Sequence, residues 1–141
     1  PKAAYTPPGG KNVRGQGVAA NVPQMKFKWS VSTLDWDGPF GWQAVTSQQI
    51  LQEIVPKLHS YETMEWGVVE GPSGSHFIEV GKLSKAAQDR LAEIDMNDID
   101  EIFSLRMQGA QRIFGVRDVA TLRMLWWDPD HGVCPAPKKH T

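Results

Sequence analysis

The sequence predicts an α+β fold, in which an antiparallel sheet carries two or three helices on one face. One observation is a helical spacing of apolar residues over 50–58 and again over 84–94. The other is an alternation of apolar and polar residues in four segments, 27–32, 102–107, 112–117 and 122–127. Short turns separate the last three segments, which predicts an antiparallel three-strand meander joined by the first strand.

Composition favours one ordinary globular domain. The chain has 141 residues, enough for a single core, and its 40% apolar and 22% charged residues disfavour disorder. The net charge of −1 gives no global attraction for nucleic acid or membranes. The single cysteine, Cys134, excludes an internal disulfide and fits a reducing compartment. Because no apolar run is long enough to span a bilayer and no signal-peptide pattern opens the chain, we expect a cytoplasmic protein without a membrane partner.

The two ends of the chain differ in composition from its middle. Residues 1–24 are rich in Gly and Pro, carry basic but no acidic side chains, and predict a flexible basic arm. Such an arm either tethers an anion or a partner, or is an unstructured leader with incidental charge. Residues 25–134 are expected to form the single globular domain, and residues 135–141 a basic tail.

Two helices follow the first predicted strand, which ends at Asp37-Gly38-Pro39. Thr46 and Gln49 have the spacing of a capping box at a helix start. The expected core-facing residues of this helix are Ile50, Leu51, Ile54, Val55 and Leu58. Pro56 inside it predicts a kink or a break.

The second helix is predicted to begin at Ser84, which caps it, and to bury a stripe of four residues, Leu83, Ala87, Leu91 and Ile94. Between the two helices, residues 64–69 fit a strand or a helix end, and residues 76–80 fit another short strand.

Arginines run through the apolar meander. Strand alternation puts Arg106 on the face of Ile102 and Ser104, and pairing across the turn at Gly109 brings it next to Arg112. Like charges side by side repel each other unless an anion lies between them. The alternative is that the arginines form solvated ion pairs with the acidic residues Asp95, Asp98, Asp100 and Glu101.

A family resemblance is carried by residues 105–117, LRMQGAQRIFGVR, followed by an apolar strand and then His131. This pattern resembles the C-terminal half of RelE/ParE-type toxins of bacterial type II toxin–antitoxin systems, including their HigB-like branch. The resemblance implies a β-α-α-β-β-β core, cleavage of mRNA, often on the ribosome, and a cognate antitoxin protein. The chain departs from the family in its basic arm, in residues 126–130, and in having no tyrosine besides Tyr5 and Tyr61.

The chemistry of RNA cleavage fits the same residues. Attack of a 2′-OH on its own phosphate needs a base, cations for the growing charge, and an acid for the leaving oxygen. A histidine exchanges protons near neutral pH, and an arginine offers a forked donor to phosphate oxygens. The predicted catalytic residues are therefore His131, Arg112, Arg106 and Arg117.

The predicted substrate-binding residues lie in the tail and among the tryptophans. A basic tail folding over the site would hold phosphate, and an indole ring would stack a splayed base, although core packing is the alternative for the tryptophans. These residues are Lys138, Lys139, His140, Trp127 and Trp42, with Trp126 as the neighbour that must face the other way.

No cofactor or metal is expected. Residues 128–140 contain several potential ligands, but their spacing matches no common zinc pattern, and residues 128–132 fit a turn fixed by aspartate side chains. The competing hypothesis to a nuclease is a non-enzymatic protein of the same fold that binds and blocks a protein target. In it the arginines hold an acidic partner and the tryptophans serve as anchors.

Overall fold

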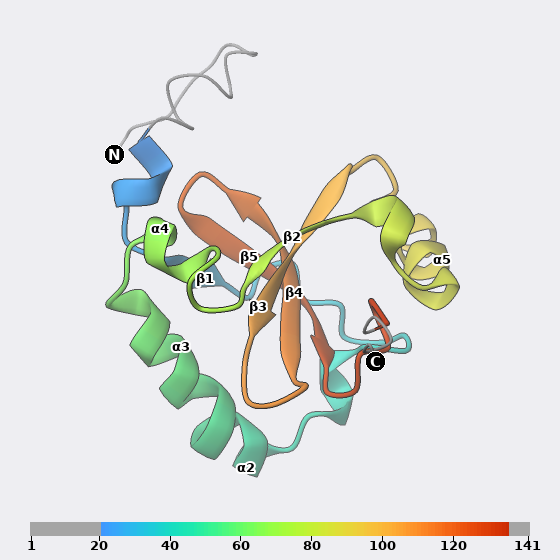
Figure 1. Ribbon diagram of the computed structural model, residues 1–141. Coiled ribbons are helices and arrows are strands. Elements are labelled where there is room, and N and C mark those ends of the chain that lie inside the picture. The colour runs from blue at the N-terminus through green and yellow to red at the C-terminus, as the bar shows by residue number, and fades with distance from the viewer. Residues whose placement is uncertain (1–20, 136–141) are drawn as a thin grey trace, which may run out of the picture.

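The computed structural model describes residues 21–135 as a five-stranded sheet with helices on both faces (Figure 1). The strand order is β1-β5-β4-β3-β2, and all neighbours are antiparallel except β1 and β5, which are parallel. The strands are β1 (Lys28–Ser30), β2 (His76–Glu79), β3 (Glu101–Arg106), β4 (Arg112–Asp118) and β5 (Thr121–Asp128). The α+β class and the C-terminal meander are thus confirmed.

The helical elements precede the meander. They are η2 (Val22–Gln24), η3 (Trp42–Ala44), α2 (Ser47–Gln49), the π-helical turn η4 (Ile50–Ile54), α3 (Val55–Glu62), α4 (Trp66–Val69), η5 (Val80–Lys82) and α5 (Lys85–Glu93). Strand β2 lies between α4 and α5, so the two-helix order implied by the family resemblance is interrupted by an additional strand. No helix between residues 21 and 135 has the length and apolarity needed to cross a bilayer.

The predicted arm and tail lie almost entirely outside the described residues. The exception is the segment around η2, where Val22 is buried in the core, so the folded domain begins before residue 25. Strand β1 is shorter than the predicted 27–32, and it runs parallel to β5. Alternation along a strand defines its faces and not its direction, which is why the parallel pairing was not predicted.

The capping box at Thr46 is confirmed, because the Gln49 N–H donates to the Thr46 hydroxyl (3.0 Å) and the Thr46 N–H donates to the Gln49 side chain (2.9 Å). The break expected at Pro56 is also present. The π-helical turn η4 ends just before α3, and Pro56 occupies the first turn of α3, where a missing N–H costs no hydrogen bond.

The expected core face of this helical segment was only partly right. Ile54, Leu58 and Tyr61 are buried, whereas Ile50, Val55 and above all Leu51, at 70% exposure, face solvent. The wider turn of η4 changes the angle between successive side chains, so the regular 3.6-residue spacing does not hold across it.

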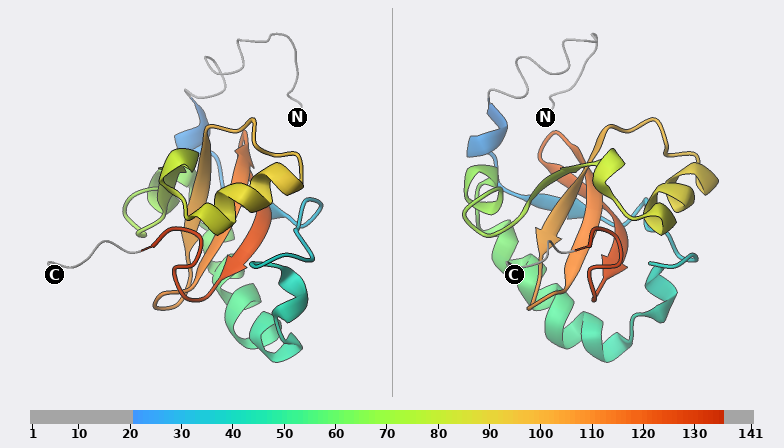
Figure 2. Two further views of the ribbon diagram at one scale, coloured as in Figure 1. Left: turned by 90° about the vertical axis from the view of Figure 1, so that its right-hand side faces the viewer. Right: turned by 45° about the vertical axis from the view of Figure 1, so that its right-hand side comes forward.

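Helices cover both faces of the sheet rather than the single face that the sequence predicted (Figure 2). On one face, here called the α3 face, Phe103, Leu105 and Ile113 pack with Leu58 and Tyr61. On the other, the α5 face, Ile102, Phe114 and Trp126 pack with Ala87 and Leu91. The central strands are apolar at both parities, and a sheet that is apolar on both faces needs cover on both.

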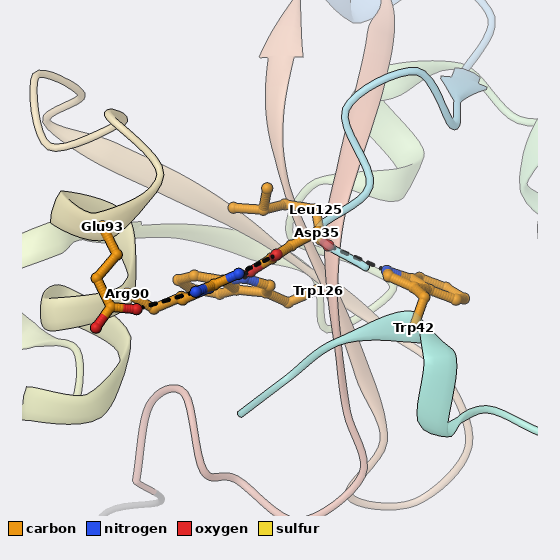
Figure 3. A network of polar contacts seen from close by, with 6 residues as sticks. All are labelled: Asp35, Trp42, Arg90, Glu93, Leu125 and Trp126. Atoms are coloured by element: carbon orange, nitrogen blue, oxygen red, sulfur yellow. Dashed lines mark hydrogen bonds and ion pairs between the residues drawn. The ribbon is translucent and has the colours of Figure 1, made fainter. Parts of the chain in front are cut away.

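The loop between β1 and η3 crosses the edge of β5 and is fixed there by Asp35 (Figure 3). The Asp35 N–H donates to the Leu125 carbonyl (2.9 Å). Its buried carboxylate accepts from Arg90 Nε (2.9 Å) and Nη2 (2.8 Å) of α5 and from Trp126 Nε1 (2.8 Å). The same strand carbonyl, Leu125, also accepts from Trp42 Nε1 (3.1 Å). One carboxylate therefore ties the loop, α5 and β5 together.

Candidate functional site

Two arginines lie side by side where β3 and β4 meet at their hairpin. Arg106 and Arg112 are direct partners in the register, as the sequence predicted, and Arg112 faces Asp128 on β5. Leu105 and Ile113 point to the α3 face, so the neighbouring arginines point to the α5 face. This end of the α5 face, with Arg106 and Arg112 at its centre, is the candidate site.

Neither arginine has a carboxylate partner among the described residues. Arg90, Arg117 and Arg123 each form an ion pair, with Asp35, Glu70 and Asp118 respectively, whereas no acidic oxygen between residues 21 and 135 lies within 4.0 Å of Arg106 or Arg112. The alternative of ion pairs with residues 95–101 is therefore not formed.

Both arginines are held by uncharged groups, Arg112 through its side chain and Arg106 through its backbone. Arg112 Nη1 donates to the carbonyls of Gly109 (2.7 Å) and Gln111 (2.8 Å), which fixes it on its own hairpin turn. The Arg106 N–H donates to Ser75 Oγ (2.9 Å), and its side chain lies over Gly74, close to where a Cβ there would stand. Both guanidinium groups thus keep donors free for a ligand.

Electrostatics make this hairpin unfavourable for a second cation. Burial lowers the pKa of the Arg112 guanidinium, and the charge of Arg106 lowers it further, while Tyr61 and Asp128 raise it by less. Burial disfavours any charge, but the repulsion between the two guanidinium groups is a cost that a bound anion would relieve. The pair therefore has the electrostatics of an anion site.

His131 lies on the turn that follows β5, three residues after Asp128, the register partner of Arg112. The buried Asp128 carboxylate accepts the N–H groups of Asp130 (3.2 Å), Gly132 (2.9 Å) and Val133 (2.8 Å), which confirms the predicted aspartate-fixed turn. Val133 is buried under α5, so the turn folds back over the α5 face, as Figure 2 (left) shows. His131 is half-buried there, at a left-handed φ of 62°.

A second histidine was missed by the sequence reasoning. His76 is the register partner of Ser104, two residues along β3 from Arg106. Its neighbour Phe77 packs on Phe103 of the α3 face, so His76 points to the α5 face and is exposed there. The pattern over residues 76–80 fits a short strand but does not define its register, so it does not place His76 near the arginines.

Arg117 is not brought to the candidate site. It lies at the far end of β4 on the α3 face, with its guanidinium 5.0 Å from the Trp66 ring centre, 4.8 Å from that of Phe77 and 3.7 Å from Glu70. Burial lowers its pKa, which Glu70 and Glu101 partly offset. These contacts with two aromatic rings and a carboxylate indicate that Arg117 stabilises the fold.

The tryptophans expected to stack a base are buried. Trp42 and Trp127 pack on each other in the α3-face core, with ring centres 6.0 Å apart, and Trp126 is fully buried on the α5 face. None of the three presents a ring to a ligand. Core packing, the alternative role that the sequence left open for these tryptophans, is the role that the structure supports.

The remaining predicted binding residues, Lys138, Lys139 and His140, lie outside the described residues. Within residues 21–135, no three His, Cys, Asp or Glu side chains are grouped so that they would hold a metal ion. Burial raises the pKa of the Cys134 thiol, and the charge of Asp128 adds to this, so this thiol is a poor nucleophile.

In comparisons with known proteins, no family model, curated protein or solved structure matches the chain. The resemblance to RelE/ParE-type toxins therefore stays a prediction that rests on residues 105–131.

Proposed function

We propose that this protein is a toxin-like ribonuclease that cleaves mRNA by attack of a 2′-OH on the adjacent phosphate. The observation that carries the proposal is the pair Arg106 and Arg112, fixed on neighbouring strands without a carboxylate. A phosphate between two guanidinium groups relieves their repulsion and accepts forked hydrogen bonds from both. The proposed partners are mRNA, free or on the ribosome, and a cognate antitoxin protein, in the cytoplasm.

The site offers a group for each step of the reaction. A base takes the proton of the 2′-OH, the 2′ oxygen bonds to phosphorus, the bond from phosphorus to the 5′ oxygen breaks, and an acid protonates that oxygen. Arg106 and Arg112 stabilise the additional negative charge on the phosphate. His76 pairs with Ser104, two residues before Arg106, and His131 lies on the turn that begins at Asp128, the register partner of Arg112; we assign these two histidines the two proton transfers.

The test is cleavage of a defined mRNA, with and without ribosomes, by wild type and by single variants. We expect His131→Ala and His76→Ala each to lower the cleavage rate roughly 10²–10⁴-fold, the usual contribution of a positioned proton-transfer group. The matched control is His59→Ala, because His59 is exposed on α3, away from the site. A substrate with 2′-deoxyribose at the cleaved position must remain intact. Full cleavage by both site variants contradicts the assignment.

A second candidate function has one observation in its favour. Ile50, Leu51 and Val55 expose apolar side chains on the outer side of the helical segment, which suits contact with a protein. In this alternative the protein blocks a target without cutting RNA. Growth arrest with intact mRNA, unchanged in the His131→Ala variant, would replace the nuclease proposal with this one.

A further inference from the structure

Trp36 is the one tryptophan with an exposed ring. All six tryptophans lie within the described residues; four are buried, Trp29 is half-buried, and Trp36 is 59% exposed. A single exposed apolar residue is common on protein surfaces and needs more than exposure to be functional. Two further observations concern the rigidity of Trp36 and its position.

Trp36 stands on a rigid support. Its neighbour Asp35 is bonded to Arg90, Trp126 and the Leu125 backbone, as Figure 3 shows. Its own carbonyl accepts the Gln43 N–H (3.2 Å), which closes the loop behind it. An aromatic ring on a fixed backbone loses little entropy when a flat ligand stacks on it.

The loop that carries Trp36 touches the turn that carries His131. The Phe40 carbonyl accepts the Trp127 N–H (3.2 Å), and the Phe40 ring lies 3.1 Å from where a Cβ on Gly132 would stand. Figure 1 shows this loop beside the C-terminal turn. Along β5, the attachment point of the loop at Leu125 and the start of the turn at Asp128 are three residues, or roughly 10 Å, apart.

We propose that Trp36 stacks a base of single-stranded RNA, close to the phosphate bound by Arg106 and Arg112. This inference rests on the proposed function, since it places a base next to the phosphate site. A single strand is the expected ligand because its bases are unpaired and present their faces, whereas the bases of a duplex are already stacked. Base stacking, which the sequence predicted for Trp42 and Trp127, is thus proposed for Trp36, whose ring is accessible.

The test is binding of a 2′-O-methyl oligonucleotide, which cannot be cut, to the full chain. We expect Trp36→Ala to weaken single-strand binding roughly 5- to 150-fold, the range that base stacking on an aromatic ring supplies. Trp36→Phe should recover most of the affinity. The matched control is Val68→Ala, which removes another exposed apolar side chain elsewhere and should bind as wild type does. Tryptophan fluorescence of the wild type should fall on binding, because Trp36 is the exposed fluorophore.

Three results would overturn the proposal: unchanged single-strand affinity of Trp36→Ala, no recovery by Trp36→Phe, or an equal loss of affinity for a duplex of the same sequence. Unchanged RNA affinity together with lost growth arrest would assign Trp36 to a protein contact instead. Because binding is measured without cleavage, it is separate from the nuclease test. If Trp36→Ala weakens single-strand binding but the histidine variants still cleave fully, the assigned proton transfers are wrong and the stacking proposal stands.

Discussion

Replacing Asp35 by asparagine tests the interaction that fixes the Trp36 loop to the body of the domain. The carboxylate is buried and accepts three hydrogen bonds, two from Arg90 and one from Trp126. Removing one partner of a buried ion pair costs roughly 3–5 kcal/mol. The variant amide keeps one acceptor oxygen, and Arg90 keeps its ion pair with Glu93 (2.9 Å). We therefore expect the lower end, about 3 kcal/mol, or a Tm lower by roughly 12 °C.

The same carboxylate predicts a pH dependence of stability. Burial alone would raise the pKa of Asp35, but hydrogen bonds from Arg90 and Trp126 and the charge of Arg90 outweigh it, so its pKa lies below the ordinary 3.8. A pKa that is lower in the folded state contributes stability that is fully present above 3.8 and is lost as pH falls below it. The stability difference between wild type and Asp35→Asn should thus be constant near neutrality and shrink in acid.

Urea unfolding at a series of pH values measures both effects. The control is Asp89→Asn, because the Asp89 pair with Lys85 (2.7 Å) is solvent-exposed and such pairs contribute little to stability. Equal midpoints for Asp35→Asn and wild type at neutral pH would refute the buried network. A difference that stays constant down to pH values well below 3.8 would refute its electrostatic origin.

Three further predictions concern the site and the helices. Sulfate should raise the Tm of the wild type and should do so much less in Arg106→Ala or Arg112→Ala, because a bound anion stabilises only the folded state; equal shifts would argue against an anion site. Gly74→Ala should lower stability, since Gly74 has a φ of +92° and Arg106 occupies the space beside it; unchanged urea unfolding would contradict this. Leu58→Ala should cost roughly 2–5 kcal/mol and Leu51→Ala little, as the burial of Leu58 and the exposure of Leu51 require.

Short sequence patterns correctly predicted those features of the fold that depend on neighbouring residues. The meander and the pairing of Arg106 with Arg112 follow from alternation and one short turn, so neighbouring residues contain the information. The capping box and the break at Pro56 are local in the same sense. The direction of β1, the strand β2 and the division of the helices between two faces depend on contacts between distant segments, which no short pattern specifies.

Three residues that the sequence predicted for the site, Arg117, Trp42 and Trp127, lie elsewhere for reasons that can be identified. Arg117 lies five residues after Arg112 on β4, so strict alternation along that strand already places its side chain on the opposite face, the face of Ile113. The bulge between Phe114 and Gly115 has its extra residue, Leu125, on β5 and leaves the alternation of β4 unchanged. Trp42 and Trp127 were assigned by residue type alone, and tryptophan serves equally in cores and on binding surfaces.

The arginines of the described residues fall into two groups, those with a carboxylate partner and those without one. Arg90 and Arg117 lie against carboxylates that hold separate segments together, and Arg123 pairs with Asp118 across the turn before β5. Arg106 and Arg112 have no such partner and stand next to each other, where each raises the electrostatic cost of the other. A hairpin that served only to hold the fold would gain nothing from this pair. A bound phosphate would turn the same repulsion into attraction, and this distinguishes Arg106 and Arg112 from the other arginines as the proposed anion site.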